Sequence, residues 1–213
     1  MALYKTIECN NDVLLGVWKI EETPQYLLSL YPADKELRAL YELDINGQRI
    51  LEKMAVRVLL HNLLPSETIV ITYEKSGRPV LNNGAFSISI SHTRNYVAVI
   101  IGPTQYTLGV DIEPVSERTV KVARRFMGTV EYESLMSSVN KVVSTVCWSA
   151  KEVLYKMIGS PVVDFRESIS VLPFDIADKG NLNAEILLDS RKTYSLDYCI
   201  FDDIALVWGI SVL

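Results

Sequence analysis

The middle of the chain reads Gly109-Val-Asp-Ile-Glu113, and Pro114 follows directly. The apolar residues in and before this stretch predict a short β-strand that ends at the proline. On a strand, Asp111 and Glu113 point to the same face, and the aliphatic residues between and before them point to the other. Two carboxylates on one face supply half of a site for a hard divalent cation. Taken alone, the same pattern also fits a solvated strand end.

A second pattern lies in the stretch Trp148-Ser-Ala-Lys-Glu-Val-Leu-Tyr-Lys156, which is rich in good helix formers and predicts a helix. Trp148, Glu152 and Lys156 are spaced by four residues and therefore share one stripe of this helix, with Lys151 beside them. The alternative is an ordinary amphipathic helix whose Glu152 and Lys156 form a surface pair worth about 0.3 kcal/mol.

The chain has only two histidines. His92 ends the segment Ser89-Ile-Ser-His92, directly after an apolar strand and before a turn. There it can either bind a ligand or satisfy the backbone of the turn. His61 lies at the back of the predicted long helix, near Pro65, and is expected to be structural.

The composition is that of a soluble globular protein, since 49% of the 213 residues are hydrophobic and 22% are charged. A net charge of -5 argues against broad nucleic-acid binding, so a polyanionic ligand would need a local basic cluster. The N-terminal residues lack the features of a signal peptide, and no apolar run approaches the roughly 20 residues that cross a bilayer. We therefore expect a cytoplasmic protein without membrane contact. Cys9, Cys147 and Cys199 are far apart in sequence and predict reduced structural thiols.

Helical and extended patterns alternate along the chain and predict an α+β fold. The segments expected in the first half are a strand at 14–20, helices at 24–30, from 32 onward and at 48–64, and strands at 68–73, 85–90 and 96–101. The segments expected in the second half are a strand at 108–112, helices at 120–126 and 147–158, and strands near 169–171, 183–188, 194–199 and 204–211. Two halves of similar size, residues 1–105 and 106–213, therefore predict a pseudo-dimer with the active site in the cleft between them.

Four motifs follow one another in the chain, namely Gly77-Arg-Pro79, Ile90-Ser-His92, Gly109-x-Asp-x-Glu113 and Trp148-x-x-Lys-Glu-x-x-x-Lys156. In this order they make the chain resemble the 4′-phosphopantetheinyl transferase superfamily, specifically the double-length type that activates peptide synthetases and carrier proteins. The resemblance covers most of residues 25–160 and includes Ala123-Arg-Arg-Phe-Met127 and Glu131-Tyr132. It implies the fold of that superfamily and an activity of the holo-[acyl-carrier-protein] synthase type. Such an enzyme moves phosphopantetheine from coenzyme A onto a serine of an acyl or peptidyl carrier protein and releases 3′,5′-ADP.

The resemblance also implies roles for individual residues. Asp111, Glu113 and Glu152 are expected to bind Mg2+, with Mn2+ as an alternative metal. The expected catalytic residues are Glu152, Lys156 and His92. The residues expected to contact coenzyme A are Lys35, Arg38, Arg49, Gly77, Arg78, Pro79, Ser91, His92, Lys151 and Lys156. The basic residues of this set would form the local basic cluster that a protein of negative net charge needs to bind a polyanion.

Two segments depart from the family pattern. Arg78 stands where many relatives carry lysine, so the cation is kept with a different donor geometry. The segment Met157-Ile-Gly-Ser-Pro161 replaces a loop that contains glycine and lysine in many relatives, which leaves the shape of the pantetheine exit open.

Arg118, Lys121 and Arg125 fall at i, i+3 and i+7 and predict a basic stripe on a helix. An acidic carrier protein is expected to dock there, and the alternative is a solvated helix face. We expect a monomer, because the two halves already provide the cleft. Two other functions remain open, which are binding of a carrier domain or coenzyme without turnover, and metal-dependent phosphate hydrolysis.

Overall fold

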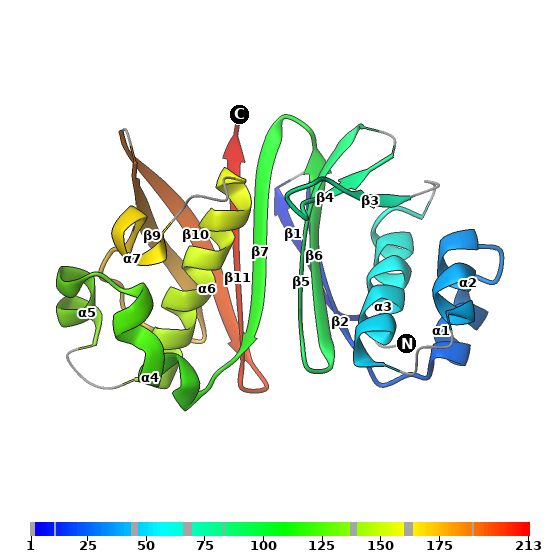
Figure 1. The fold of residues 1–213 in the computed structure, drawn as a ribbon, viewed down its shortest axis with the longest axis horizontal. Coiled ribbons are helices and arrows are strands. Elements are labelled where there is room, and N and C mark those ends of the chain that lie inside the picture. The colour runs from blue at the N-terminus through cyan, green and yellow to red at the C-terminus, as the bar shows by residue number, and fades with distance from the viewer. Residues whose placement is uncertain are drawn as a thin grey trace. The chain divides into compact units, whose positions relative to one another are not determined.

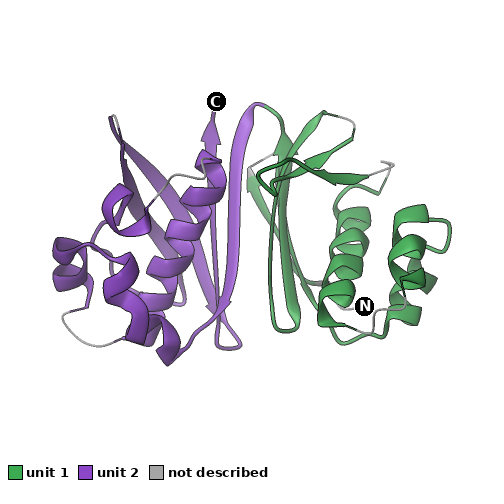
Figure 2. Ribbon diagram, viewed as in Figure 1, with its two compact units in different colours: residues 1–104 green, residues 105–213 purple. Residues whose placement is uncertain are grey.

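The structure is a computed structural model that describes residues 3–10, 12–43, 47–65, 70–82, 84–136, 140–159, 164–188 and 190–213. It divides into two compact units, Met1–Thr104 (unit 1) and Gln105–Leu213 (unit 2), which Figure 2 shows in green and purple. Within the described ranges, no helix has both the length and the apolar character needed to span a bilayer.

Unit 1 is built on a four-stranded antiparallel sheet (Figure 1). Its elements are β1 (Leu3–Asn10), β2 (Val13–Lys19), α1 (Pro24–Leu30), α2 (Lys35–Glu42), α3 (Gln48–Leu63), β3 (Ile71–Tyr73), β4 (Pro79–Leu81), β5 (Phe86–Thr93) and β6 (Tyr96–Pro103). The sheet order is β1-β2-β6-β5, and β3 pairs with β4 in a separate two-stranded sheet. The apolar face of α3 packs against β2 and β6, and α1 and α2 pack against α3.

Unit 2 is built on a five-stranded antiparallel sheet with the order β7-β11-β10-β9-β8 (Figure 1). Its elements are β7 (Tyr106–Pro114), α4 (Glu117–Phe126), α5 (Thr129–Leu135), α6 (Lys141–Ile158), α7 (Phe165–Ser168), β8 (Ile169–Val171), β9 (Lys179–Leu187), β10 (Arg191–Phe201) and β11 (Ile204–Val212). The long helix α6 packs against β7 and β11 and is buried along most of its length. Its buried residues form the centre of the unit 2 core.

The two units share a topology. In each, one strand leads into the helices, and the last strand of the unit returns to pair with it, as β6 pairs with β2 and β11 pairs with β7. In each, the longest helix lies over this strand pair, and a glycine on the first strand lies beneath the helix. A Cβ atom at Gly16 would lie 2.7 Å from Leu59 Cδ1 of α3. The equivalent glycine of unit 2 is Gly109, on β7.

Local signals fix the ends of α6. The side chain of Asn140 accepts hydrogen bonds from the backbone N–H groups of Val142 and Val143 and so caps the first turn. Gly159 ends the helix in the left-handed conformation, with φ of 65°, which glycine adopts without strain.

The prediction of a mixed α and β fold is confirmed, and several boundaries differ. Helix α6 begins at Lys141 rather than Cys147, because Asn140 caps it there and its first turns are buried. The strand β1 was not predicted, and its residues alternate poorly between polar and apolar. Of the strand predicted at 68–73, the first two residues lie outside the described residues, and β3 covers the last three. Residues 160 and 161 of the altered segment after Lys156 also lie outside the described residues.

Candidate active site

The two central motifs are joined by an ion pair in unit 2. Asp111 lies on β7 and is buried, with 4% of its surface exposed. Lys156 lies in the last turn of α6, and its Nζ donates to Asp111 Oδ1 at 2.9 Å. The same ammonium group donates to the backbone carbonyl of Val110 at 2.8 Å. The strand and the helix that the sequence predicted separately are therefore in contact through charged side chains.

Glycine allows α6 to approach β7 this closely. A Cβ atom at Gly109 would lie 2.6 Å from the carbonyl oxygen of Val153 and 2.8 Å from Met157 Cγ, both on α6. Gly209 on β11 lies opposite Gly109, and a Cβ atom there would lie 2.8 Å from Met157 Sδ. Contacts this short are too close for van der Waals packing. Because Val153 follows Glu152 directly, Gly109 allows the turn of α6 that carries Glu152 to pack against β7.

The carboxyl groups of this cluster perturb one another. Burial and the neighbouring carboxylates of Asp111 and Glu152 raise the pKa of Glu113 to about 7, although Lys156 and Arg118 act in the opposite direction. The pKa of Glu152 is raised as well, first by burial and then by Asp111. The three carboxyl groups therefore lie within electrostatic reach of one another, and a positive charge placed among them would be stabilised.

The predicted metal ligands fit Mg2+ in chemistry. Carboxylate oxygens are the hard ligands that Mg2+ prefers, and a divalent cation would relieve the repulsion that raises the pKa of Glu113. In the part of the chain that the structure describes, however, no three His, Cys, Asp or Glu side chains are gathered tightly enough to hold a metal ion. Asp111 is instead paired with Lys156. The assignment of Asp111, Glu113 and Glu152 as ligands stays a prediction.

Lys151 has a different environment from the one predicted. Its side chain is fully buried, and its Nζ donates to Glu131 Oε2 at 2.7 Å and to the backbone carbonyls of Phe165 and Ile169. Burial lowers the pKa of the Lys151 ammonium, whereas Glu131 opposes that shift. The prediction that Lys151 contacts coenzyme A is wrong in this conformation, because all three ammonium hydrogens are used inside unit 2. The ion pair ties α6 to α5, and the two hydrogen bonds to backbone carbonyls tie it to α7 and to the start of β8.

Glu131 completes this buried network. Its Oε2 also accepts the backbone N–H of Gly128, and its Oε1 accepts the backbone N–H of Val171. The carboxylate thus caps α5 and binds the strand β8 at the same time. Glu131-Tyr132 is part of the family resemblance, and the contact of Glu131 with α6 was not predicted.

Unit 1 contains a pocket with a volume of about 350 Å³. Its lining residues come from α3, β3, β5 and the turn between β3 and β4, and they are Arg49, Glu52, Lys53, Val56, Arg57, Tyr73, Gly77, Ile90 and His92. Three residues predicted to contact coenzyme A therefore line one pocket, namely Arg49, Gly77 and His92. Two further cations were missed, Lys53 and Arg57. They continue from Arg49 at intervals of four residues, so the helical period of the sequence contains the signal that could have found them.

The other predicted coenzyme residues of unit 1 lie outside the lining of this pocket. Lys35 and Arg38 are exposed on α2, and the guanidinium of Arg38 donates to the carbonyl of Pro32 at 2.8 Å. Arg78 is exposed in the β3–β4 turn, followed by Pro79 at the start of β4. Ser91 is buried on β5.

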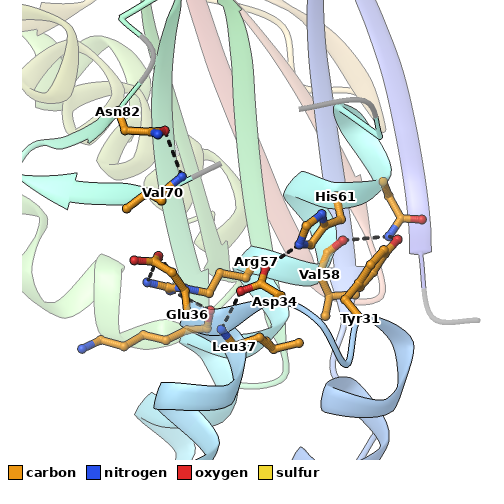
Figure 3. A network of polar contacts seen from close by, with 11 residues as sticks. Tyr31, Asp34, Glu36, Leu37, Arg57, Val58, His61, Val70 and Asn82 are labelled. Atoms are coloured by element: carbon orange, nitrogen blue, oxygen red, sulfur yellow. Dashed lines mark hydrogen bonds and ion pairs between the residues drawn. The ribbon is translucent and has the colours of Figure 1, made fainter. Parts of the chain in front are cut away.

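Two ion pairs fasten the start of α2 to α3, as Figure 3 shows. Arg57 Nη2 lies 3.0 Å from Glu36 Oε2, and His61 Nε2 pairs with Asp34 Oδ2. Asp34 also caps α2 by accepting from the backbone N–H of Leu37 at 2.8 Å. Burial alone would raise the pKa of Asp34, but the hydrogen bonds from Leu37 and His61 lower it below its usual value. His61 is thus structural, as predicted, and Lys35 lies between two anchored acidic residues.

The predicted basic stripe lies on α4 of unit 2. Arg118, Lys121 and Arg125 are all exposed there. Arg124, which is also exposed, places its guanidinium 4.0 Å above the ring centre of Tyr132 on α5. In the described structure these three residues form a cluster of exposed cations on α4.

Residues 107–203 match the family model of the 4′-phosphopantetheinyl transferase superfamily. The 4′-phosphopantetheinyl transferase psf-1 of Bacillus pumilus is 27% identical over 119 residues, which cover 53% of this chain and 50% of that protein. The 4′-phosphopantetheinyl transferase gsp of Aneurinibacillus migulanus is 32% identical over 118 residues, which cover 53% of this chain and 46% of that protein. The chain therefore spans about half the length of these relatives. The family match includes the carboxylate cluster of unit 2 and does not extend to the pocket of unit 1.

Proposed function

We propose that the chain transfers phosphopantetheine from coenzyme A to a carrier-protein serine, because residues 107–203 match the family model of the 4′-phosphopantetheinyl transferase superfamily. One observation supports the proposal above all others. Within the family segment, Lys156 is paired with Asp111 beside Glu113 and Glu152, so a lysine and three carboxyl groups form one charged cluster. The products would be the holo carrier protein and 3′,5′-ADP, as for a holo-[acyl-carrier-protein] synthase.

Each residue of the charged cluster in unit 2 is proposed to have its own role in the transfer reaction. Asp111, Glu113 and Glu152 would hold Mg2+, which supplies charge neutralisation at the pyrophosphate when it is bound. Lys156 moves from its bond with Asp111 to a phosphate oxygen and stabilises the negative charge that develops there. Glu152 accepts the proton of the attacking serine hydroxyl, directly or through a water.

Coenzyme A is proposed to bind through the cations of unit 1. Arg49, Lys53, Arg57 and His92 line the same pocket, which is the local basic cluster that an acidic protein needs to bind a polyanion. The tyrosine ring of Tyr73 offers an aromatic face in the same pocket. We propose that both units serve one reaction as a pseudo-dimer with its active site in the cleft between the halves. The topology common to the two units supports this proposal.

The acidic carrier protein is proposed to dock on the exposed basic stripe of α4. Reversing the charge with Lys121→Glu should raise the Michaelis constant for the carrier protein and leave that for coenzyme A unchanged. Lys179→Glu is the matched control, because Lys179 is also exposed in unit 2 but lies on β9. Equal effects of the two substitutions would favour a solvated helix face. We further propose a cytoplasmic enzyme that acts as a monomer.

The decisive experiment is the incubation of the protein with coenzyme A, Mg2+ and a purified apo carrier protein, followed by intact mass spectrometry. A carrier that gains phosphopantetheine, with release of 3′,5′-ADP, supports transfer. A carrier whose serine is replaced by alanine must stay unmodified. Asp111→Ala should abolish transfer, whereas Glu133→Ala, which removes an exposed carboxylate on α5, should not.

The same assay separates the two competing functions. Cleavage of coenzyme A without modification of the carrier would indicate a phosphohydrolase. Binding of coenzyme A or carrier without any chemical change would indicate a binding protein. Full transfer activity in Asp111→Ala would remove the metal-site assignment.

A further inference from the structure

The pocket of unit 1 contains one residue whose charge opposes anion binding. Glu52 lies on α3 among the cations Arg49, Lys53 and Arg57, and only 8% of its surface is exposed. A buried carboxylate is costly unless it is paired, and here it also weakens the attraction of the pocket for a phosphate. Its presence therefore calls for a partner inside the pocket.

That partner is His92. Glu52 Oε2 lies 3.1 Å from His92 Nδ1, and the side chains are 10% and 55% exposed, respectively. The carboxylate is held by the rigid helix α3, whereas the imidazole lies near the end of β5 and is open to a ligand. An ionised carboxylate can only accept a hydrogen bond, so this contact favours a proton on Nδ1 of the imidazole. Nε2 is the ring nitrogen that remains for a ligand.

The position of the proton decides what His92 can do for a phosphate. In the neutral ring with hydrogen on Nδ1, Nε2 is an acceptor and cannot bond an ionised phosphate oxygen. In the imidazolium, both nitrogens donate, Nδ1 to Glu52 and Nε2 to the phosphate. A ring that is neutral before binding must therefore take up one proton from solvent to bind an anion at Nε2.

Other groups in the pocket act on the same ring. Arg49, Lys53 and Arg57 of α3 carry positive charges that oppose the imidazolium, and Arg94 lies in the turn that follows His92. The phenol of Tyr73 on β3 also lines the pocket. The carboxylate of Glu52 is thus the described negative charge that lines the pocket and compensates the cations.

We propose that Glu52 is a positioning residue that holds the ring of His92 with Nδ1 protonated, so that His92 binds a phosphate of coenzyme A as an imidazolium and binding takes up a proton. This inference rests on the proposed function and adds a residue and a proton to it. Glu52 does not touch the substrate in this scheme and acts through His92.

The first test reads the imidazole directly and needs no coenzyme. Long-range proton–nitrogen NMR spectra distinguish the two ring nitrogens, and the chain has only two histidines, so His92→Gln assigns the signals. We expect hydrogen on Nδ1 of His92 in the unmodified protein and loss of this preference in Glu52→Ala. Glu36→Gln is the matched control, because it removes a carboxylate that pairs with the pocket residue Arg57, and it should leave the His92 signals unchanged. An unmodified protein with hydrogen only on Nε2 would overturn the proposal.

The second test is calorimetric titration with coenzyme A in two buffers of different ionisation enthalpy, which counts the protons taken up on binding. Near pH 7.5 we expect net proton uptake by the unmodified protein and none by His92→Gln. Glu52→Gln should bind coenzyme A about tenfold more weakly, as expected for loss of a hydrogen bond to a charged group. In the His92→Gln background Glu52→Gln should no longer weaken binding, because only the loss of its opposing charge remains.

The outcomes separate this inference from the proposed function. Equal losses from Glu52→Gln with and without His92 would refute the positioning role, as would binding without proton uptake. If Glu52→Gln does not fold, His92→Gln and the spectra of the unmodified protein still decide the question, because His92 is largely exposed. If the unmodified protein does not bind coenzyme A at all, the proposed function and the proton uptake fail together. The NMR spectra then still show whether Glu52 fixes the ring.

Discussion

Replacing Lys151 with methionine tests whether this residue is structural. Methionine fills a similar volume without the ammonium group, so Lys151→Met leaves Glu131 buried with 3% of its side chain exposed and without its cation. Two backbone carbonyls, those of Phe165 and Ile169, lose a donor as well. Breaking a buried ion pair by removing one partner costs about 3–5 kcal/mol. The substitution should therefore remove a large part of the stability of unit 2, since whole domains have about 5–15 kcal/mol.

The second substitution, Glu131→Gln, should restore part of this loss in the double variant. Glutamine removes the uncompensated charge and can still accept the backbone hydrogen bonds from Gly128 or Val171. We expect a coupling of about 1–3 kcal/mol between the two positions. Lys141→Met is the control, because Lys141 is exposed in the first turn of the same helix and should change stability by about 0.5 kcal/mol or less.

Urea unfolding followed by tryptophan fluorescence provides the measurement. Trp148 on α6 and Trp208 on β11 report on unit 2, and Trp18 reports on unit 1. Coenzyme A affinity is measured on the folded protein in parallel. The reasoning fails if Lys151→Met unfolds like the unmodified protein but loses coenzyme A binding, because that result would restore the contact predicted from the sequence.

Three further outcomes are expected. Gly109→Ala places a Cβ atom 2.6 Å from a backbone oxygen of α6, so it should lower the free energy of unfolding in urea by about 1–3 kcal/mol and reduce transfer activity. Unchanged stability and activity would show that α6 is not constrained at this position. Without added metal, the contribution of Glu113 to stability should be present below pH about 4.5 and lost as the pH rises towards about 7, because its folded-state pKa is raised. Thermal unfolding measured across this pH range should show a smaller loss of stability in Glu113→Gln than in the unmodified protein. Arg57→Met removes a cation from the unit 1 pocket, so the Michaelis constant for coenzyme A should rise while that for the carrier protein stays constant. A change in only the Michaelis constant for the carrier protein would contradict the assignment of the pocket to coenzyme A.

The strand and helix that carry the charged cluster could be predicted because their signals are local. Alternation around Gly109–Glu113 and the four-residue spacing from Trp148 to Lys156 both lie within single elements. The start of α6 could not be placed in the same way. Residues 142–147 include β-branched valine and threonine, which have low helix propensity, and their burial in the unit 2 core overrides that preference.

Contacts between segments that are far apart in the chain could not be predicted from the sequence. Lys151 faces inward because Glu131 and the carbonyls near α7 and β8 surround it, and nothing in the helical period distinguishes such a lysine from a surface one. The pairing of Glu52 with His92 likewise depends on the packing of α3 beside β5. By contrast, the cations Arg49, Lys53 and Arg57 of α3 could have been predicted as a group from their four-residue spacing, but Lys53 and Arg57 were missed.

The burial of Lys151 has a consequence for how this helix can change during evolution. Successive residues of an α-helix are offset by about 100° around its axis, so an anchored Lys151 sets the angular phase at which Glu152 emerges next to it. Insertion of a single residue between Lys151 and Glu152 would turn the Glu152 carboxyl away from Asp111 on β7, even if every motif residue survived. Substitutions on the exposed side of α6 should accumulate freely, whereas changes in its length should be purged.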